Sequence, residues 1–158
     1  MTPATQLAKK ANITFELLAY QHDSNNQAYG EEAAATLGLA AQQVFKTLLV
    51  AESATTMPIA CALVPVSHQL DLKAVAKALN RKKVSMANPE LAQKSSGYLV
   101  GGISPLAQKK SLPTLIDTSA QQFDKIYVSA GKRGLEIALA ASALAALCRG
   151  QFVDIKHL

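Results

Sequence analysis

The chain has 158 residues, of which 49% are hydrophobic and 17% charged, and its formal net charge is +5. This composition excludes a disordered protein, and the length is enough to bury a core without disulfides or metal ions, which predicts one domain over residues 1–158. The longest apolar stretch, 137–148, is too short to span a bilayer, and the start of the chain lacks the pattern of a secretory signal. We therefore expect a cytoplasmic protein that does not associate with membranes.

The first half of the chain alternates helical and strand patterns. Thr2 and Pro3 predict a helix N-cap followed by proline at the first helical position, and Gly38 predicts the end of the next helix. Two apolar runs separated by a short turn at 53–56 predict a hairpin, and the polar run 20–27 predicts a long loop. The predicted helices are 3–10, 31–37 and 71–79, and the predicted strands are 13–18, 44–50, 57–64 and 83–86.

The second half continues the same mixture. Asn88 and Pro89 predict another capped helix start, Gly150 predicts a helix end, and residues 130–133 predict a turn between two paired strands. The predicted helices are 89–94 and 140–147, and the predicted strands are 98–100, 114–116, 125–129, 134–139 and 152–155. Because hairpins and helical connections mix without a regular βαβ repeat, we predict a mixed α/β (α+β) fold whose central, largely antiparallel sheet is flanked by short helices.

One lysine stands inside the apolar strand pattern of residues 44–50. Side chains alternate along a strand, so Lys46 shares a face with Val44, Leu48 and Val50. A desolvated ammonium is costly unless an anionic or strongly polar group meets it, which indicates a site for a negatively charged ligand. The alternative is a lysine whose stem packs on the sheet while its ammonium reaches water.

Motifs for metal-dependent and nucleophilic catalysis are missing. The chain has no Gly-x-Ser-x-Gly, His-Glu-x-x-His or Cys-x-x-Cys motif and neither a phosphate-loop nor a dinucleotide fingerprint. His22, His68 and His157 are scattered, and we expect them at the surface. Cys61 and Cys148 have no metal-ligand spacing and are expected as reduced core residues. We therefore expect no metal and no cofactor.

Two glycine-bearing segments and several basic groups complete the candidate features. The backbone amides at Gly101-Gly102 could bind an oxyanion, and 129–134 combines a hydroxyl with two cations, although ordinary turns explain both segments equally well. The basic groups 81–83, 109–110 and 132–133 are either solvated surface or, if they gather around Lys46, a phosphate-binding patch. These residues alone indicate an anion-binding α/β domain.

Three segments together resemble the YbaK/prolyl-tRNA synthetase-associated domain family over essentially the whole chain. They are Phe45-Lys46-Thr47-Leu48-Leu49-Val50, the run from Gly97 to Leu106, and Ile126-Tyr127-Val128-Ser129 with Gly131-Lys132-Arg133-Gly134. The resemblance is strongest to the free-standing bacterial YbaK proteins, which are cysteinyl-tRNA(Pro) deacylases. It implies that Lys46 is the central functional residue and that the substrate pocket is lined by Tyr20, Tyr29, Lys46, Thr47, Gly101 and Ser129. Lys132 and Arg133 are expected to contact tRNA phosphates.

Three positions depart from the family's usual residues. Tyr29 stands where phenylalanine is usual, which could make the pocket more polar, and Ala107 and Ala130 replace common glycines. Alanine seldom adopts a left-handed backbone conformation, so Ala130 puts such a conformation beside Ser129 in doubt.

The resemblance implies an editing enzyme of translation that removes cysteine from mischarged Cys-tRNA(Pro), and also from Cys-tRNA(Cys). Lys46 would anchor a phosphate or polarise the ribose-ester oxygens, and the thiol of the cysteinyl group would attack its own ester carbonyl. The enzyme is then a hydrolase, or a lyase if a thiolactone leaves. The alternatives are a sister Ala-tRNA(Pro) deacylase and a non-catalytic module that binds tRNA ends or a synthetase. Expected partners are the acceptor end of aminoacylated tRNA and prolyl-tRNA synthetase.

Overall fold

Five strands form the main sheet of the computed structural model, which describes residues 1–158. Their order is β5 (Ser85–Met86), β2 (Phe45–Ala51), β3 (Ala60–Pro65), β6 (Thr114–Asp117) and β9 (Gly150–Val153). β2 pairs antiparallel with both of its neighbours, whereas β6 pairs parallel with β3 and with β9. A largely antiparallel mixed sheet is predicted, but the sequence does not identify which strands pair in parallel, because these strands are joined through helices and long loops rather than through hairpins.

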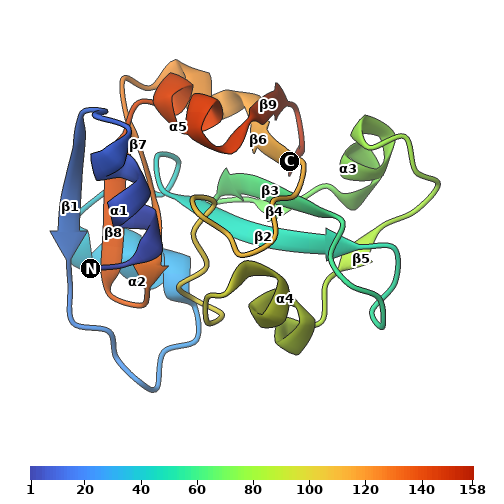
Figure 1. Cartoon of the computed structure of the whole chain (residues 1–158), viewed down its shortest axis with the longest axis horizontal. Helices are drawn as coiled ribbons and strands as arrows, with labels where there is room; N and C mark the ends of the chain where they lie inside the picture. Colours follow the sequence, from blue (N-terminus) through green and yellow to red (C-terminus); the bar gives the residue numbers. More distant parts are fainter.

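A second, antiparallel sheet lies beside the first (Figure 1). Its order is β1 (Phe15–Ala19), β8 (Leu135–Leu139) and β7 (Ile126–Lys132), and a short antiparallel pair is formed by β4 (Gln69–Leu70) and β10 (Lys156–His157). Five of the seven strand pairings are therefore antiparallel. The predicted mixed α/β fold is confirmed, but the strands divide between separate sheets rather than one central sheet, and the main sheet has two antiparallel and two parallel pairings.

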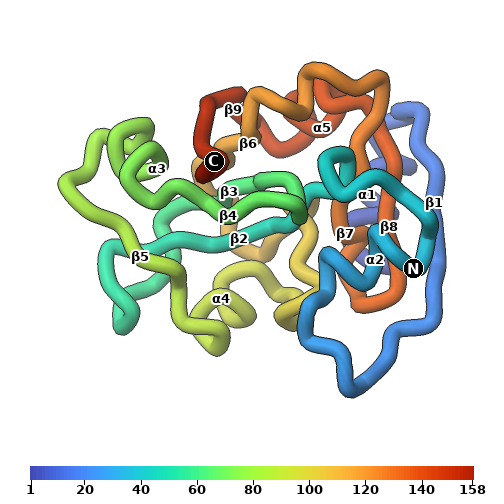
Figure 2. Tube along the Cα trace, turned by 180° about the vertical axis from the view of Figure 1, so that it is seen from behind, coloured from blue at the N-terminus to red at the C-terminus, as the bar shows by residue number.

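The helices are short and surround the two sheets. They are α1 (Pro3–Lys10), α2 (Tyr29–Leu37), α3 (Leu72–Ala78), α4 (Pro89–Ser96), the 3₁₀ helix η1 (Thr118–Gln122) and α5 (Ala141–Cys148). Figure 1 shows α4 and α5 on opposite sides of the main sheet, while α1 covers the second sheet. The view from behind in Figure 2 shows α2 close to β7 and β8. No helix has the length and apolar character that crossing a membrane requires.

The predicted helix starts are confirmed where a side chain caps them. The Thr2 hydroxyl accepts a hydrogen bond from the Thr5 amide at 3.2 Å, and the Asn88 carboxamide oxygen accepts one from the Glu90 amide at 2.8 Å. Gly38 ends α2 in the left-handed conformation, as predicted.

Three local predictions are wrong. Residues 98–100 form no strand, because the amide and the hydroxyl of Tyr98 are bonded to Ser96 and to the carbonyl of Leu106. Residues 130–132 continue β7 through a bulge, which leaves only Arg133 and Gly134 for the turn. The residue that caps the C-terminus of α5 is Arg149, which adopts the left-handed conformation, and not Gly150, which already belongs to β9.

The two alanines that replace common glycines behave differently. Ala107 has a φ of 57° and lies in an exposed loop, so this alanine does occupy a left-handed conformation. In the bulge beside Ser129 it is Gly131, with a φ of 107°, that adopts positive φ, and Ala130 does not. The departure at Ala130 therefore leaves the backbone at Ser129 unaffected.

The largest apolar core lies between the two sheets and includes residues of α1 and α5. Phe45 and Leu63 from the main sheet belong to the same buried cluster as Ile126 and Ile137 from the second sheet, and none of the four is more than 1% exposed. Cys61 is buried in this cluster and Cys148 packs against it, as expected of core thiols. Burial of this apolar surface holds the two sheets together.

Candidate active site

A pocket of about 370 Å³ opens where the two sheets meet α2 and α4. The start of β2 joins the sheets, because Val44 bridges Tyr127 and the Tyr127 amide donates to the carbonyl of Gln43 at 3.1 Å. All six residues predicted to line a substrate pocket do line this one: Tyr20, Tyr29, Lys46, Thr47, Gly101 and Ser129. They come from the end of β1, the start of α2, β2, the turn after α4 and the bulge of β7.

Lys46 is half-buried in this pocket and has no ion-pair partner in the protein. Burial lowers the pKa of its ammonium, and the nearby charge of Glu31 opposes that shift. Gly30 lets α2 approach this part of the molecule, since a Cβ atom there would lie 2.4 Å from Cγ1 of Val66 and 3.8 Å from Cβ of Lys46. A half-buried lysine that forms no ion pair within the protein fits a residue that binds an anionic ligand.

The two hydroxyl residues of the pocket differ in what they bind. The Thr47 hydroxyl oxygen is buried and has no hydrogen-bond partner, although Thr47 is among the residues that line the pocket. The Ser129 hydroxyl accepts a hydrogen bond from the Gly131 amide at 3.2 Å and so helps to hold the bulge of β7. Neither Cys nor His lines the pocket, which leaves both hydroxyls without an imidazole base.

The Gly101-Gly102 turn brings the loop after α4 against two other segments. Gly101 has a φ of 88°, and a Cβ atom there would lie 2.6 Å from the Tyr29 ring. A Cβ atom on Gly102 would lie 2.7 Å from Cα of Lys132. The Gly102 amide is already bonded to the carbonyl of Leu99 at 2.9 Å, so it is not free for an oxyanion. Of the two glycines, only Gly101 lines the pocket.

Glu136 is a pocket residue that the sequence analysis missed. It lies in β8, lines the pocket and is 6% exposed. Burial raises the pKa of its carboxyl to about 8, and no ion pair offsets this cost. A signal was present, because Glu136 is a single acid between the apolar residues Leu135 and Ile137, just as Lys46 is a single cation in an apolar strand.

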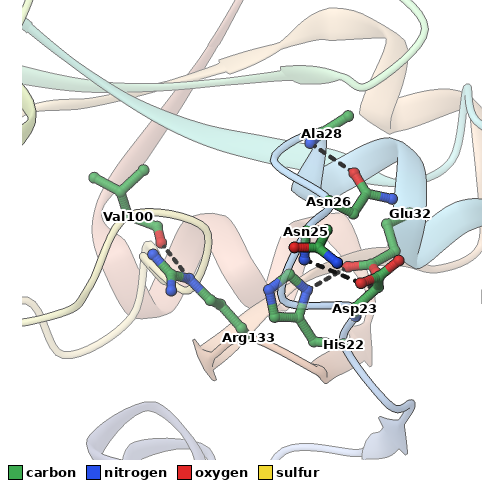
Figure 3. Close-up of polar contacts among 8 residues, drawn as sticks. All are labelled: His22, Asp23, Asn25, Asn26, Ala28, Glu32, Val100 and Arg133. Carbon is green, nitrogen blue, oxygen red and sulfur yellow. Dashed lines mark hydrogen bonds and ion pairs between the residues drawn. The ribbon is translucent and has the colours of Figure 1, made fainter.

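The expectation that all three histidines lie at the surface is correct only for His157, which is exposed. His68 is partly buried and its Nδ1 lies 2.9 Å from the Ser67 hydroxyl. The His22 side chain is 17% exposed, and its Nδ1 lies 2.6 Å from Oε1 of Glu32 (Figure 3). A partner ten residues further on, in another element, could not be read from the sequence around His22.

The basic groups lie outside the pocket lining. Lys132 and Arg133 are exposed, and the Arg133 Nε donates to the carbonyl of Val100 at 2.8 Å. The guanidinium carbon of Arg133 also lies 4.9 Å from the centre of the Tyr29 ring. Residues 81–83 and 109–110 are exposed as well, and Arg81 pairs with Glu52. None of these residues is among those that line the pocket with Lys46.

The chain belongs to the aminoacyl-tRNA editing domain family, whose model matches residues 25–147. A relative from Enterococcus faecalis, named "Putative Cys-tRNA(Pro)/Cys-tRNA(Cys) deacylase EbsC", is 40% identical over 132 residues, which are 84% of this chain and 79% of the relative. The resemblance drawn from the three sequence segments is thus confirmed.

Solved structures confirm the fold. The crystal structure of a hypothetical protein superposes with a TM-score of 0.86 at 21% identity and covers 99% of this chain and 100% of its own. The crystal structure of "a putative trans-editing enzyme for prolyl tRNA synthetase" superposes with a TM-score of 0.81 at 18% identity and covers 100% of this chain and 99% of its own. At these identities the two structures support the fold alone.

Proposed function

We propose that residues 1–158 form one editing domain that removes cysteine from mischarged Cys-tRNA(Pro), and also from Cys-tRNA(Cys). The observation that supports this most directly is a pocket that holds a half-buried cation and a buried carboxyl, both without protein partners. An aminoacyl ester at the end of a tRNA carries a matching pair of groups, an α-ammonium and a nearby phosphate. The 40% identical relative bears the name of a deacylase for the same two substrates.

Lys46 would bind the phosphate or the ribose-ester oxygens rather than act as a base. An ammonium is a compact charge suited to these oxygens, and burial strengthens the interaction. General-base catalysis needs a lysine pKa near the working pH, several units below its ordinary value.

Glu136 would receive the α-ammonium of the aminoacyl group. A carboxyl buried without a partner is poorly ionised, and a cation beside it lowers its pKa again. Binding of a substrate ammonium would therefore ionise Glu136 and form a charge-assisted hydrogen bond in the pocket. This contact would select for aminoacyl esters with a free amino group.

Ester cleavage would be carried out by the substrate's own thiol. The cysteinyl sulfur attacks its ester carbonyl carbon, the bond from that carbon to the ribose oxygen breaks, and the thiol proton passes to the departing ribose oxygen. A thiol of pKa about 8.5 is a few per cent ionised near neutrality, and intramolecular placement is equivalent to roughly 10⁵ M or more of nucleophile. The product is a thiolactone that water later opens. The Gly101 amide, which donates no hydrogen bond within the protein, would stabilise the oxyanion.

Recognition of the tRNA body would require a partner. Lys132 lies against Gly102 and Arg133 against the ring of the pocket residue Tyr29, and both could contact phosphates of the acceptor end, but Arg133 already uses one donor on Val100. So small a basic surface gives little selection among tRNAs. We therefore include prolyl-tRNA synthetase in the proposal as the protein that supplies tRNA choice.

The experiment that tests the function compares the deacylation of cysteinyl-, alanyl- and prolyl-tRNA(Pro) by the purified protein. We expect cysteinyl-tRNA(Pro) to be cleaved fastest and prolyl-tRNA(Pro) to be spared. Preferred cleavage of alanyl-tRNA(Pro) would identify the sister deacylase. Binding of tRNA without cleavage of any of the three would identify a non-catalytic module.

A further inference from the structure

Glu32 is a buried carboxylate outside the pocket that binds the loop leading into it. It lies in the first turn of α2 and is 7% exposed. Its Oε1 lies 2.6 Å from Nδ1 of His22, and its Oε2 accepts a hydrogen bond from the Asp23 amide at 2.8 Å (Figure 3). Burial raises the pKa of Glu32, but the hydrogen bonds from His22 and Asp23 outweigh burial and lower it. The ionised carboxylate thus attaches the loop to α2 at two adjacent residues.

The rest of this loop is ordered by its own side chains as far as α2. The Asp23 carboxylate accepts a hydrogen bond from the Asn25 amide at 3.0 Å, and the Asn26 side chain accepts one from the Ala28 amide at 2.8 Å (Figure 3). Gln27 and Ala28, together with Tyr29, line the pocket. The loop that Glu32 binds is therefore part of the pocket wall.

The Tyr29 ring contacts residues of three segments: this loop, the turn after α4 and the turn after β7. The His22 ring lies 5.6 Å from the Tyr29 ring, centre to centre, and the Arg133 guanidinium lies 4.9 Å from the same centre. Gly101 leaves no room between its backbone and this ring, and the carbonyl of its neighbour Val100 accepts the hydrogen bond from Arg133. Displacement of His22 would therefore free one side of a ring that otherwise packs against Gly101 and Arg133.

We propose that Glu32 is a positioning residue for catalysis: through His22 and the Asp23 amide it fixes the Tyr29 ring and so sets the width of the aminoacyl pocket. The inference rests on the proposed function, because pocket width matters here for how closely the aminoacyl group is held. Intramolecular attack depends on sub-ångström placement, and a 1 Å displacement can reduce a rate by roughly 100-fold. Neither Glu32 nor His22 lines the pocket, so neither contacts the substrate directly.

The kinetic test uses Glu32→Gln, which keeps the shape of the side chain but removes its charge and leaves one acceptor oxygen for both His22 and the Asp23 amide. We expect kcat for cysteinyl-tRNA(Pro) to fall by roughly 10- to 100-fold while KM changes less than about 2-fold, since neither Glu32 nor His22 lines the pocket. The preference for cysteinyl- over alanyl-tRNA(Pro) should also decrease. Glu90→Gln is the matched control, because Glu90 lies in the first turn of α4 and is exposed.

Variants of His22 separate positioning from a merely structural role. His22→Gln retains a donor for Glu32 and should keep most of the activity. His22→Leu should lose activity, but no more than Glu32→Gln, which also weakens the hydrogen bond to the Asp23 amide. The double variant Glu32→Gln, His22→Leu should lose no more activity than Glu32→Gln alone, because both changes disrupt the same contact between Glu32 and His22. Additive losses, or unchanged kcat in Glu32→Gln, would overturn the inference.

Hydrogen exchange of the ligand-free protein tests the attachment without any substrate. Peptides covering residues 21–28 should exchange faster in Glu32→Gln than in the wild type or in Glu90→Gln, while peptides of β6 and β7 stay unchanged. Unchanged exchange at 21–28 would overturn the inference even if activity fell. If the wild type cleaves none of the three aminoacyl-tRNAs, the proposed function is wrong, and so is a catalytic role for Glu32. Hydrogen exchange would still show whether Glu32 holds the loop 21–28.

Discussion

Lys46 is the residue at which the proposed chemistry can be tested most directly. We expect Lys46→Ala to reduce deacylation by at least about 100-fold in a protein that remains folded, because it removes a buried donor to the substrate but leaves an open pocket rather than a closed cavity. Lys46→Arg should also be poor, since a planar guanidinium does not replace a compact ammonium. Deacylation time courses and circular dichroism measure the two effects. The control is Lys77→Ala, because Lys77 is an exposed lysine of α3. Near wild-type turnover by Lys46→Ala would refute the role of Lys46.

Glu136 makes a prediction about stability as well as activity. Its folded-state pKa of about 8 lies above the ordinary value of 4.5, so its contribution to the free energy of unfolding is fully present below pH 4.5 and is lost as the pH rises through about 8. Glu136→Gln cannot ionise, so the variant should gain stability relative to the wild type between pH 5 and pH 9, measured by urea unfolding.

The same substitution should weaken activity. Glutamine cannot form an ion pair with the substrate ammonium, so kcat/KM of Glu136→Gln should fall about 10-fold or more. In the unfolding experiment, a free energy of unfolding that changes with pH in the same way for wild type and Glu136→Gln would show that Glu136 is already ionised in the free pocket. Unchanged kcat/KM would show that Glu136 does not bind the amino group.

At the scale of elements, Asp117 joins the end of β6 to the C-terminal segment. Its Oδ1 accepts hydrogen bonds from the amides of Ile155 and Lys156 at 2.9 and 3.0 Å, and its Oδ2 accepts one from the Ser119 amide at 3.1 Å. Asp117 is fully buried. Burial raises its pKa, but these hydrogen bonds outweigh burial and lower it. One carboxylate thus satisfies three amides from two elements.

We expect Asp117→Ala to lower the free energy of unfolding by about 3 kcal/mol, because buried amides lose their acceptor. Asp117→Asn keeps one acceptor and should cost less. A lowered pKa means that the stability from ionised Asp117 is present above its ordinary value of 3.8 and is lost as the pH falls through the folded-state value. The gap between wild type and Asp117→Ala should therefore narrow in acid, as measured by urea unfolding. A gap that is the same at neutral and acidic pH would contradict this assignment.

At the scale of the whole molecule, the mechanism predicts that the substrate supplies the nucleophile. Cysteinyl-tRNA(Pro) should be cleaved much faster than seryl-tRNA(Pro), although the two differ by one atom, because a serine hydroxyl is barely ionised near neutral pH. Discrimination by fit between such similar groups is limited to about 10- to 200-fold, and loss of the nucleophile should cost more. Competing deacylation assays with the two substrates measure the ratio.

Product analysis provides the independent check. Mass spectrometry should detect cysteine thiolactone before it hydrolyses, and reaction in ¹⁸O-labelled water should leave this first product unlabelled. Direct release of labelled cysteine, or similar rates with seryl-tRNA(Pro), would indicate an enzyme-positioned water and reject attack by the substrate thiol.

Features that depend only on neighbouring residues can be predicted from the amino-acid sequence. The caps at Thr2 and Asn88 and the stop at Gly38 follow from side chains that bond or bend the backbone within a few positions. The β2–β3 hairpin is likewise a short connection between two apolar runs. The motif residues around Lys46, Gly101 and Ser129 predicted which side chains line one pocket, and the structure places them there.

Strand pairings and side-chain partners between distant segments depend on how the whole chain packs. The parallel pairing of β3, β6 and β9 depends on strands separated by long connections, which no local pattern specifies. Glu136 and Lys46 are each a single charge in an apolar strand, and only the packing of the two sheets places both in one pocket. The sequence predicts His22 at the surface, whereas the structure buries most of its side chain against Glu32, which lies on another element. Burial and partner choice are properties of the folded chain, and they determine the ionisation of these residues.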